Sequence, residues 1–415
     1  MKHQAASSAV FVLLVACGGA PEPASTPPGE GLDEKALQTM FAEAAPGDVI
    51  EIPAGHYPLT RSLTLHVDGV TVRGAGMDAT VLSFKGQIAG AEGLLVNADD
   101  FTIEDLAIED TKGDALKINE GRNIVIRRVR TEWTGGPATT NGAYGIYPVQ
   151  TENTLIEASV AIGASDAGIY IGQSKNVVVR DSRAEYNVAG IEIENTVFAD
   201  VHDNLATNNT GGILVFNMPD LPIAGHSTRL FRNRIVSNNT PNFAIAGTAV
   251  AGVPAGAGVV VNSNDKVEIF DNEIADNQTA NVLISSYFSA DYSGERQMAD
   301  AFDPYPETIF VYGNRFTGGG AHPDRTELEA LRVAMFGADG RLPDVVWDGR
   351  VNPARLVDGR LDPAYGLCVD NGEAVVLNVD AGNDYRQPSV DPNAHRCTHE
   401  KLGSVRLPMF EVADR

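Results

Sequence analysis

A short phrase recurs along the middle of the chain, and this repetition limits the possible folds more than any other feature. Each copy is a small residue followed by an apolar triplet, as in AGIYI and AGIEI. Four consecutive copies are 22 or 23 residues apart, at Gly145, Gly168, Gly190 and Gly212. The phrase resumes at Gly258 and Asn281, after a gap of 46 residues that must hold a loop excursion. A unit of this size cannot bury an apolar face alone, so consecutive units must stack.

A second strand is predicted about eight residues after each phrase. Segments 123–126, 176–179, 266–269 and 308–311 alternate apolar and variable residues, which is the period of a β-strand. Units then end in a polar pair whose second member is an asparagine, at Asn204, Asn233, Asn272 and Asn314. Stacking would place these amides about 4.8 Å apart, close enough to hydrogen-bond along the axis. We therefore interpret these asparagines as structural.

Leucine-rich repeats have a similar period, but the repeats here carry Ile, Val and Gly in place of the leucine-rich consensus. Coils of parallel β-structure fit better. From about Gly47 to Gly320 the sequence resembles the right-handed parallel β-helix proteins of the pectin-lyase-like kind, and PGDVIEIPAGHY, from Pro46 to Tyr57, is similar to their first coil. The expected fold class is therefore all-β, a right-handed parallel β-helix of about 22-residue coils.

Both ends of this solenoid are expected to be covered. The segment 33–45, with Leu37, Met40 and Phe41 at helical spacing, resembles the N-terminal cap helix of that superfamily. The period is lost from about residue 321, where PDRTELEALRVAMFG predicts a helix capped by Thr326 or Asp324. The region 321–415 should cap the open end, because the unpaired strand edges of an uncovered coil can pair with another chain.

The N-terminus predicts export to the cell envelope. An apolar run ends in Leu14-Val15-Ala16-Cys17, which resembles the lipobox of bacterial lipoproteins. This resemblance implies a signal peptide over 1–16 and acyl chains, palmitate among them, on Cys17; an ordinary signal peptide is the alternative. Gly18 resembles the sorting pattern for the outer membrane, so an outer membrane lipoprotein is expected. Residues 17–32, rich in Pro, Gly and Ser, predict a flexible tether.

The two remaining cysteines, Cys368 and Cys397, predict a disulfide, since oxidation is permitted in an exported chain. Such a bond would stabilise the fold by roughly 3 kcal/mol. The alternative is a metal site formed by His395, Cys397 and His399. We expect no metal and no cofactor.

The formal charge of −24 has the wrong sign for a nucleic-acid partner. It also repels anionic polymers at long range. Binding one of them would require a local basic patch or bridging cations.

A stripe of outward-facing residues is the candidate binding site. Lys117, Tyr147, Tyr170 and Glu192 follow the small residue in four consecutive coils, so they should line up over roughly 15 Å. Tyrosine offers an apolar face and a hydroxyl to a sugar ring, the lysine could pair with a uronate, and the glutamate could move a proton. Trp133, in the insertion 131–145, could wall the same face. The alternative is a solvated stripe with two stacked aromatic rings.

A second outward column is interpreted as a structural ladder of ion pairs. It contains Arg127, Glu157, Arg180 and His202, followed by Phe231, Phe270 and Tyr312. The excursion 216–256, which holds four prolines, could be a lid or a spacer.

Catalytic residues cannot be assigned from the sequence. The clustered aspartates of pectate lyases and the Asp-Pro-His-Asp signature of alginate epimerases, two enzyme groups of this fold, are absent. The phrases IPAGHY and VTVRGAGMDATVLSF resemble a group of exported bacterial β-helix lipoproteins of unassigned function, often encoded beside a second exported protein, frequently of the haem c type. The chain has no C-x-x-C-H motif of its own.

Two functional hypotheses follow. The first is an envelope-anchored β-helix, spanning 33–320, that binds a polysaccharide and could also process it. The second is a non-catalytic scaffold that docks an exported partner protein. Whether the protein is an enzyme stays open at this stage.

Overall fold

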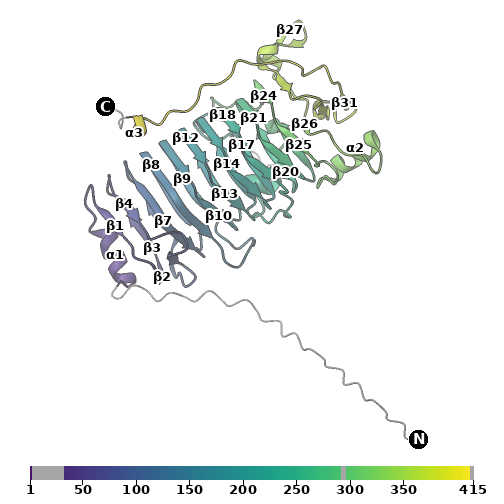
Figure 1. The fold of residues 1–415 in the computed structure, drawn as a ribbon. Coiled ribbons are helices and arrows are strands. Elements are labelled where there is room, and N and C mark those ends of the chain that lie inside the picture. The colour runs from purple at the N-terminus through teal and green to yellow at the C-terminus, as the bar shows by residue number, and fades with distance from the viewer. Residues whose placement is uncertain (2–31, 291–295, 412–415) are drawn as a thin grey trace.

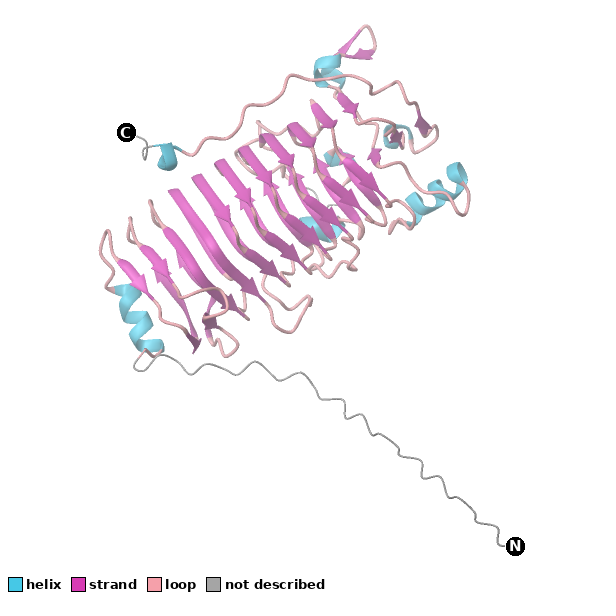
Figure 2. Ribbon diagram, viewed as in Figure 1, coloured by secondary structure: helices cyan, strands magenta, loops and turns pink. Residues whose placement is uncertain are grey.

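The computed structural model describes residue 1 and residues 32–290 and 296–411. The described residues form an elongated stack of coils, each built from short parallel strands, with a helix at the N-terminal end (Figures 1 and 2). Partner strands lie one coil apart, so residues some 22 positions apart become neighbours. The predicted repeat is therefore confirmed. The signal peptide and Cys17 lie outside the described residues, as does nearly all of the tether. No helix in the described part of the chain is long and apolar enough to cross a membrane.

Three faces run along the stack. The face that we call the site face contains the recurring phrase; its strands are β3 (Arg61–Leu65), β6 (Ala89–Val96), the beginnings of β8 (Leu116–Glu132) and β9 (Tyr144–Glu157), β11 (Ala167–Gly172), β14 (Ala189–Glu194), β17 (Gly211–Phe216), β20 (Ala257–Asn262), β23 (Ala280–Ser285), β26 (Val345–Trp347) and β30 (Val376–Asn378). All of its described ladders are parallel except where β31 (Ser389–Val390) adds antiparallel to β30.

The second face, which we call the strap face, contains the predicted second strand. Its strands are β1 (Val49–Glu51), β4 (Thr71–Arg73), the first part of β7 (Thr102–Glu109), the middle of β8, the end of β9, β12 (Lys175–Arg180), β15 (Val197–His202), β18 (His226–Phe231), β21 (Asp265–Phe270), β24 (Ile309–Tyr312) and β29 (Leu367–Asp370). The third face holds shorter strands: β2 (Gly55–Pro58), β5 (Thr80–Ser83), the ends of β7 and β8, β10 (Val160–Ile162), β13 (Arg183–Glu185), β16 (Leu205–Thr207), β19 (Arg234–Val236), β22 (Glu273–Ala275) and β25 (Arg315–Thr317).

Stacks of Ile, Val and Leu fill the interior, because alternate residues of every strand point inward. On the site face the inward column is fully buried, at Ile169, Ile191, Ile213, Val259 and Val282. Trp133 belongs to this interior core: it is 4% exposed, and its indole Nε1 donates to the Thr111 carbonyl over 2.8 Å. The expectation that Trp133 walls the outer face is therefore wrong, because the start of its insertion turns inward.

Asparagine ladders hold the turns between strands. In the predicted ladder, Asn204 donates to Asn233 over 3.0 Å, and Asn233 donates to Asn272 over 3.0 Å. Their structural role is confirmed, since these side chains are buried and also bond the backbone of neighbouring coils. A second ladder that we did not predict runs from Asn187 through Asn209 and Asn238 to Asn277.

The N-terminal end is covered by α1 (Glu34–Ala42), as predicted. Asp33 caps the helix by accepting from the Ala36 amide over 2.8 Å. Leu37 is fully buried and Phe41 is 3% exposed, so both seal the first coil.

The C-terminal region departs from the expected simple cap in two ways. The coils continue past residue 321, since β26, β29 and β30 pair with earlier strands. The predicted helix is α2 (Thr326–Phe336), but its N-cap residue is Arg325 and no side chain caps it. Asp324 instead accepts from the Ala255 amide over 3.0 Å. The remaining elements are short: η3 (Pro353–Arg355), β27 (Leu356–Val357), β28 (Arg360–Leu361), η4 (Pro363–Tyr365) and η5 (Ala381–Asn383).

The last described residues form a strap, defined as residues 400–411, which runs back along the strap face and includes α3 (Pro408–Glu411) (Figure 1). Its Leu402 amide donates to Glu268, and its Val405 amide donates to Asp200, each over 3.1 Å. Leu407 packs on an apolar column that contains Val125, Leu155 and Val178. The strap thus covers several coils made much earlier in the chain.

Candidate functional site

The predicted stripe exists. On the site face Lys117 pairs in register with Tyr147, and Tyr170 pairs with Glu192. The rings of Tyr147 and Tyr170 are 4.9 Å apart between centroids, so these two residues also lie on adjacent coils. The outward column continues through Leu214, Val260 and Leu283. The interpretation as a solvated stripe does not fit, because Tyr170 is 4% exposed and Glu192 only 1%.

Three tyrosines form the centre of the site. Tyr144 was not predicted, yet its ring centroid lies 4.4 Å from that of Tyr147 and 4.6 Å from that of Tyr170. Tyr144 directly precedes Gly145 of the recurring phrase, three residues before Tyr147. The rings are tilted or edge-on to one another, at interplanar angles of 41°, 45° and 84°, as is typical of packed aromatic pairs.

Carboxyl groups surround the tyrosines. The Tyr170 hydroxyl donates to Glu194 Oε1 over 2.6 Å, and Tyr144 is near enough to Asp166 to lower the pKa of that carboxyl slightly. Glu192 lies on the same strand as Glu194, and its buried Oε2 has no hydrogen-bond partner among the described residues. Of these acids only Glu192 was predicted. Asp166 belongs to the turn before β11, where strand periodicity gives no direction for a side chain.

Burial brings the pKa values of these carboxyls toward neutral pH. It raises the pKa of Asp166 to about 8, with the nearby Glu194 and Asp114 charges adding to the effect. It raises the pKa of Glu194 to about 7 against the opposing hydrogen bond from Tyr170. The pKa of Glu192 is also raised well above its ordinary value, by burial and then by the charges of Asp166 and Glu194. Since like charges this close cannot all ionise easily, the cluster holds protons at neutral pH.

Lys117 lies at the edge of this cluster. Its Nζ is 3.8 Å from Asp114 Oδ2 and 4.9 Å from the Tyr147 ring centroid. Burial raises the pKa of Asp114 to about 6, and the lysine opposes that shift. Lys117, which we expect to pair with a uronate, already faces a carboxyl group of the protein itself in this structure.

Part of the excursion covers the next coils of the site face. The gap of 46 residues holds one complete coil, with β18 and β19, and an insertion at 237–256 that includes η1 (Ala249–Gly252). Val250 and Val253 pack with Leu214 and Phe216, and Leu214 is fully buried. The insertion therefore forms a wall immediately beyond Glu192.

A groove of about 660 Å³ lies on the other side of this wall. Its floor includes Val260, Leu283 and Val346 of the site face, and Leu328 and Leu331 of α2 form one side. The groove is largely apolar and separate from the carboxyl cluster.

The second outward column is a ladder, as predicted. Arg127 and Arg180 both pair with Glu157, and His202 begins a stack of rings. The Phe231 and Phe270 rings, and the Phe270 and Tyr312 rings, are 4.9 Å apart and within 7° of parallel. These residues hold coils together.

The cysteine prediction is confirmed by a disulfide between Cys368 and Cys397. The alternative metal site is contradicted, because Cys397 is occupied by this bond. The His395 and His399 rings instead hydrogen-bond the carbonyls of Leu367 and Gly366 over 3.1 and 2.8 Å. The bond ties the residues just before the strap to β29.

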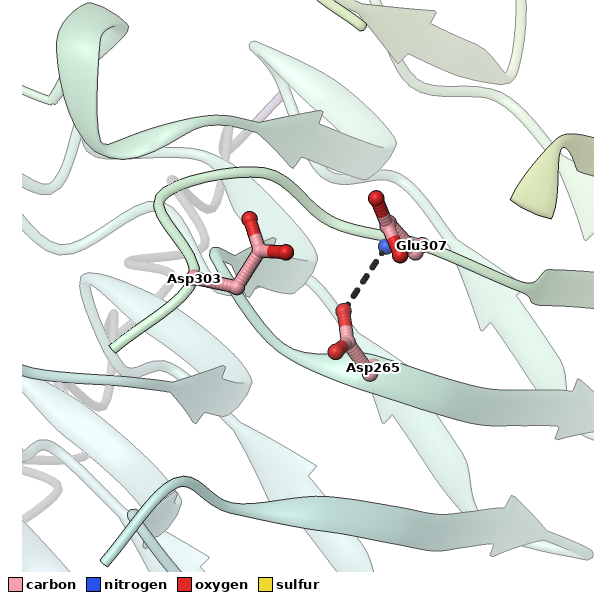
Figure 3. A group of neighbouring side chains, drawn as sticks. All are labelled: Asp265, Asp303 and Glu307. Atoms are coloured by element: carbon pink, nitrogen blue, oxygen red, sulfur yellow. Dashed lines mark hydrogen bonds between the residues drawn. The ribbon is translucent and has the colours of Figure 1, made fainter. Parts of the chain in front are cut away.

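One acidic trio away from the site face was not predicted. Oxygens of Asp265, Asp303 and Glu307 lie within 4.8 Å of one another (Figure 3). Arg355 Nε, however, is 2.9 and 3.0 Å from the two oxygens of Glu307, and Asn352 donates to Asp303 over 3.1 Å. Asp265 accepts from the Glu307 amide over 3.0 Å. Protein donors thus already use all three groups, which tie the segment between η2 (Tyr287–Ser289) and β24 to β21.

Comparisons with known proteins give the fold a name. Residues 68–225 match the family model described as a right-handed β-helix region. The fold is a right-handed parallel β-helix. The search of curated proteins found no match to the chain.

Several solved structures are similar to this β-helix. They include the A-module of mannuronan C-5 epimerase AlgE6 from Azotobacter vinelandii (19% identity over 71% of this chain and 85% of that one, TM-score 0.43). They also include an alginate lyase from Paenibacillus sp. str. FPU-7 (16% identity over 69% of this chain and 96% of that one, TM-score 0.43). A third is a DFA-IIIase variant from Arthrobacter chlorophenolicus A6 in complex with DFA-III (12% identity over 79% of this chain and 91% of that one, TM-score 0.46).

Proposed function

We propose that the protein binds a saccharide chain on the site face, along the stripe from Lys117 to Glu192, and processes it by proton transfer. The observation that supports this proposal most strongly is the burial of Asp166 and Glu192, with the half-buried Glu194 next to them, beside three tyrosine rings. Burying carboxyls is unfavourable unless they are compensated, and such clusters are typical of functional sites.

Hydrolysis of a glycosidic bond is the reaction that this chemistry fits best. One protonated carboxyl would give its proton to the bridging oxygen as the bond from that oxygen to the anomeric carbon breaks. A second, ionised carboxyl would take a proton from the water whose oxygen bonds to that carbon. Asp166 and Glu194, with pKa values of about 8 and 7, are suited to these two roles near neutral pH. Elimination on a uronate fits less well, because the substrate carboxylate would enter a site that is already acidic.

The test is turnover of a panel of oligosaccharides by wild type and by Glu194→Gln, with release of reducing ends as the readout. Loss of at least about 99% of the activity is expected, since removing a proton-transfer group lowers rates by roughly 10² or more. Glu152→Gln, a half-exposed carboxyl of the strap face, is the matched control and should retain activity. Ultraviolet absorbance of an unsaturated product would instead identify a lyase. Absence of both binding and turnover across the panel would contradict the proposal and favour docking of an exported partner.

We also propose that the β-helix is tethered to the outer membrane through acyl chains on Cys17. The support is the Leu-x-Ala-Cys pattern and the Pro-rich segment after it. Metabolic labelling with a palmitate analogue should mark the wild-type chain and leave Cys17→Ala unlabelled. Equal labelling of both chains would contradict this proposal.

A further inference from the structure

The groove beyond the insertion has no part in the proposed reaction. Its volume of about 660 Å³ falls in the range of about 300–1,000 Å³ that is usual for sites of small molecules. Its floor is formed by Val260, Leu283 and Val346, which are in register on three successive strands. With Phe216 of β17 at one end, the floor spans three strand spacings, or about 15 Å.

Hydrogen bonds hold the walls of the groove in place. Arg325, at the start of α2, donates to the Gly252 carbonyl of the insertion. Asp324 accepts from the Ala255 amide over 3.0 Å, and its own amide donates to Thr279 Oγ1 over 2.9 Å. Helix α2 is therefore fixed both to the insertion and to a coil that carries the floor, so the groove is preformed.

Aliphatic side chains dominate the lining. Leu328 and Leu331 of α2 line one side, and Ala334, further along the same helix, contributes only a methyl group. The aromatic residues of the described lining are Phe216 and Tyr385. The groove therefore offers a ligand a mainly aliphatic surface.

The polar groups of the floor are already used by the protein. Asn262 Nδ2 donates to Ser285 Oγ over 2.9 Å, and Asp348 Oδ2 accepts from the Ser286 amide and hydroxyl, each over 2.7 Å. The strands β20, β23 and β26 also pair with a neighbouring coil on both sides, so their backbone groups are taken. A sugar or an extended peptide would bury its own hydrogen-bonding groups here without partners, which is unfavourable. An aliphatic chain has no such groups.

We propose that the groove binds the acyl chain of a lipid, which lies lengthwise across the floor strands. An extended chain advances about 1.2 Å per bond, because a fully extended residue has three backbone bonds and spans about 3.3–3.6 Å. The floor of about 15 Å therefore accommodates about twelve carbons. Arg325 and Glu327, both at the start of α2, have opposite charges, so the chain and not the head group should determine the affinity. This site is separate from the proposed saccharide site and does not depend on it.

The test is calorimetry of the full chain with lysophosphatidylcholines whose acyl chains have from about eight to about sixteen carbons, on either side of the expected length. Each lipid is kept below its aggregation concentration. The zwitterionic head group avoids repulsion by a chain of charge −24. Because burying a methylene group is favourable, affinity should rise about twofold to fourfold per added carbon. The rise should stop at about twelve carbons, where the floor ends.

Substitutions on α2 separate binding in the groove from binding elsewhere. Ala334→Trp should weaken binding of the lipid of about twelve carbons at least about tenfold, because the indole occupies space in the groove. Val333→Trp is the matched control: Val333 is 43% exposed on the same helix and is not part of the lining, so affinity should equal that of wild type. Leu283→Glu is a second variant, which places a charge on the floor and should weaken binding as well. Circular dichroism verifies that each variant is folded.

Three outcomes would overturn the inference. One is failure of every chain length to bind. Another is an affinity that keeps rising with chain length and is unchanged in Ala334→Trp, since this indicates adsorption to the surface. The third is self-association of the lipid-free chain that Ala334→Trp abolishes and lipid does not displace, which would assign the groove to a second copy. None of them affects the saccharide proposal, whose turnover is measured separately.

Discussion

At the scale of single residues, buried asparagine side chains hold the turns between strands in place. Asn233 accepts from Asn204, donates to Asn272, and also donates to the Val201 carbonyl over 2.8 Å. Asn233→Ala leaves several buried partners unsatisfied, so we expect the free energy of unfolding to fall by about 1–3 kcal/mol. Denaturant titration measures this change. The exposed Asn393→Ala should change the value by less than about 0.5 kcal/mol, and a similar loss in both variants would contradict the ladder's role.

The site residues should also make stability depend on pH. The pKa of Asp166 is raised from 3.8 to about 8, so between these values the folded chain keeps a proton that the unfolded chain has released. Stability therefore falls as pH rises from about 4 to 8. Glu192 and Glu194 act in the same direction.

Asp166→Asn removes one of these titrations. Its free energy of unfolding should decline less than that of wild type when pH rises from about 5 to 8, as measured by denaturant titrations at several pH values. The exposed Asp181→Asn is the control and should follow wild type. A steeper decline in Asp166→Asn would show that the predicted direction of the pH dependence of stability is wrong.

The sequence predicts part of this site and misses the rest for a physical reason. Tyr147, Tyr170 and Glu192 are found because strand alternation fixes which side they face. Asp166 and Glu194 are missed, since one lies in a turn and the other comes at the end of its strand, where the outward column had already been assigned to Glu192. The pKa values depend on burial in the folded molecule, which repeat spacing does not reveal.

At the scale of elements, the strap is held by few contacts and should be separable. Leu407 is 8% exposed against its apolar column, and burying a leucine is worth about 1.5–3 kcal/mol. Leu407→Glu should therefore raise the population of molecules in which the strap is detached by roughly tenfold to hundredfold. Trypsin cleavage after Lys401 or Arg406 should accelerate accordingly. Leu356→Glu, at a leucine that is 41% exposed, is the control; equal rates in both variants would show that Leu407 does not hold the strap.

The elements that repeat from coil to coil could be predicted from the sequence, whereas those that depart from the repeat could not. The two strands of each coil and α1 follow from alternation and helical spacing. The strap could not be predicted, because its partners on β15 and β21 are 205 and 134 residues away in sequence. Trp133 was assigned outward because an insertion breaks the register that the repeat otherwise provides.

At the scale of the whole molecule, the first coil must stay covered. Phe41→Asp places a charge where a 3% exposed ring seals the stack, which should detach α1 and expose a parallel edge. We expect self-association that grows with protein concentration, measured by sedimentation velocity. Lys35→Asp puts the same charge on the exposed side of α1, and its sedimentation should match that of wild type at every concentration. Equal sedimentation of all three proteins would argue against the sealing role.

The strap also has a consequence for how the molecule is made. Val405 bonds Asp200, a residue synthesised half a chain earlier. If the polypeptide crosses a membrane starting from its N-terminus, the coils can wind while the remainder is still in transit. Their surface at Val125, Leu155 and Val178 nevertheless stays bare until residues 400–411 have been made and have packed against it. Removal of the strap would therefore expose an apolar surface on the strap face to contact with other proteins.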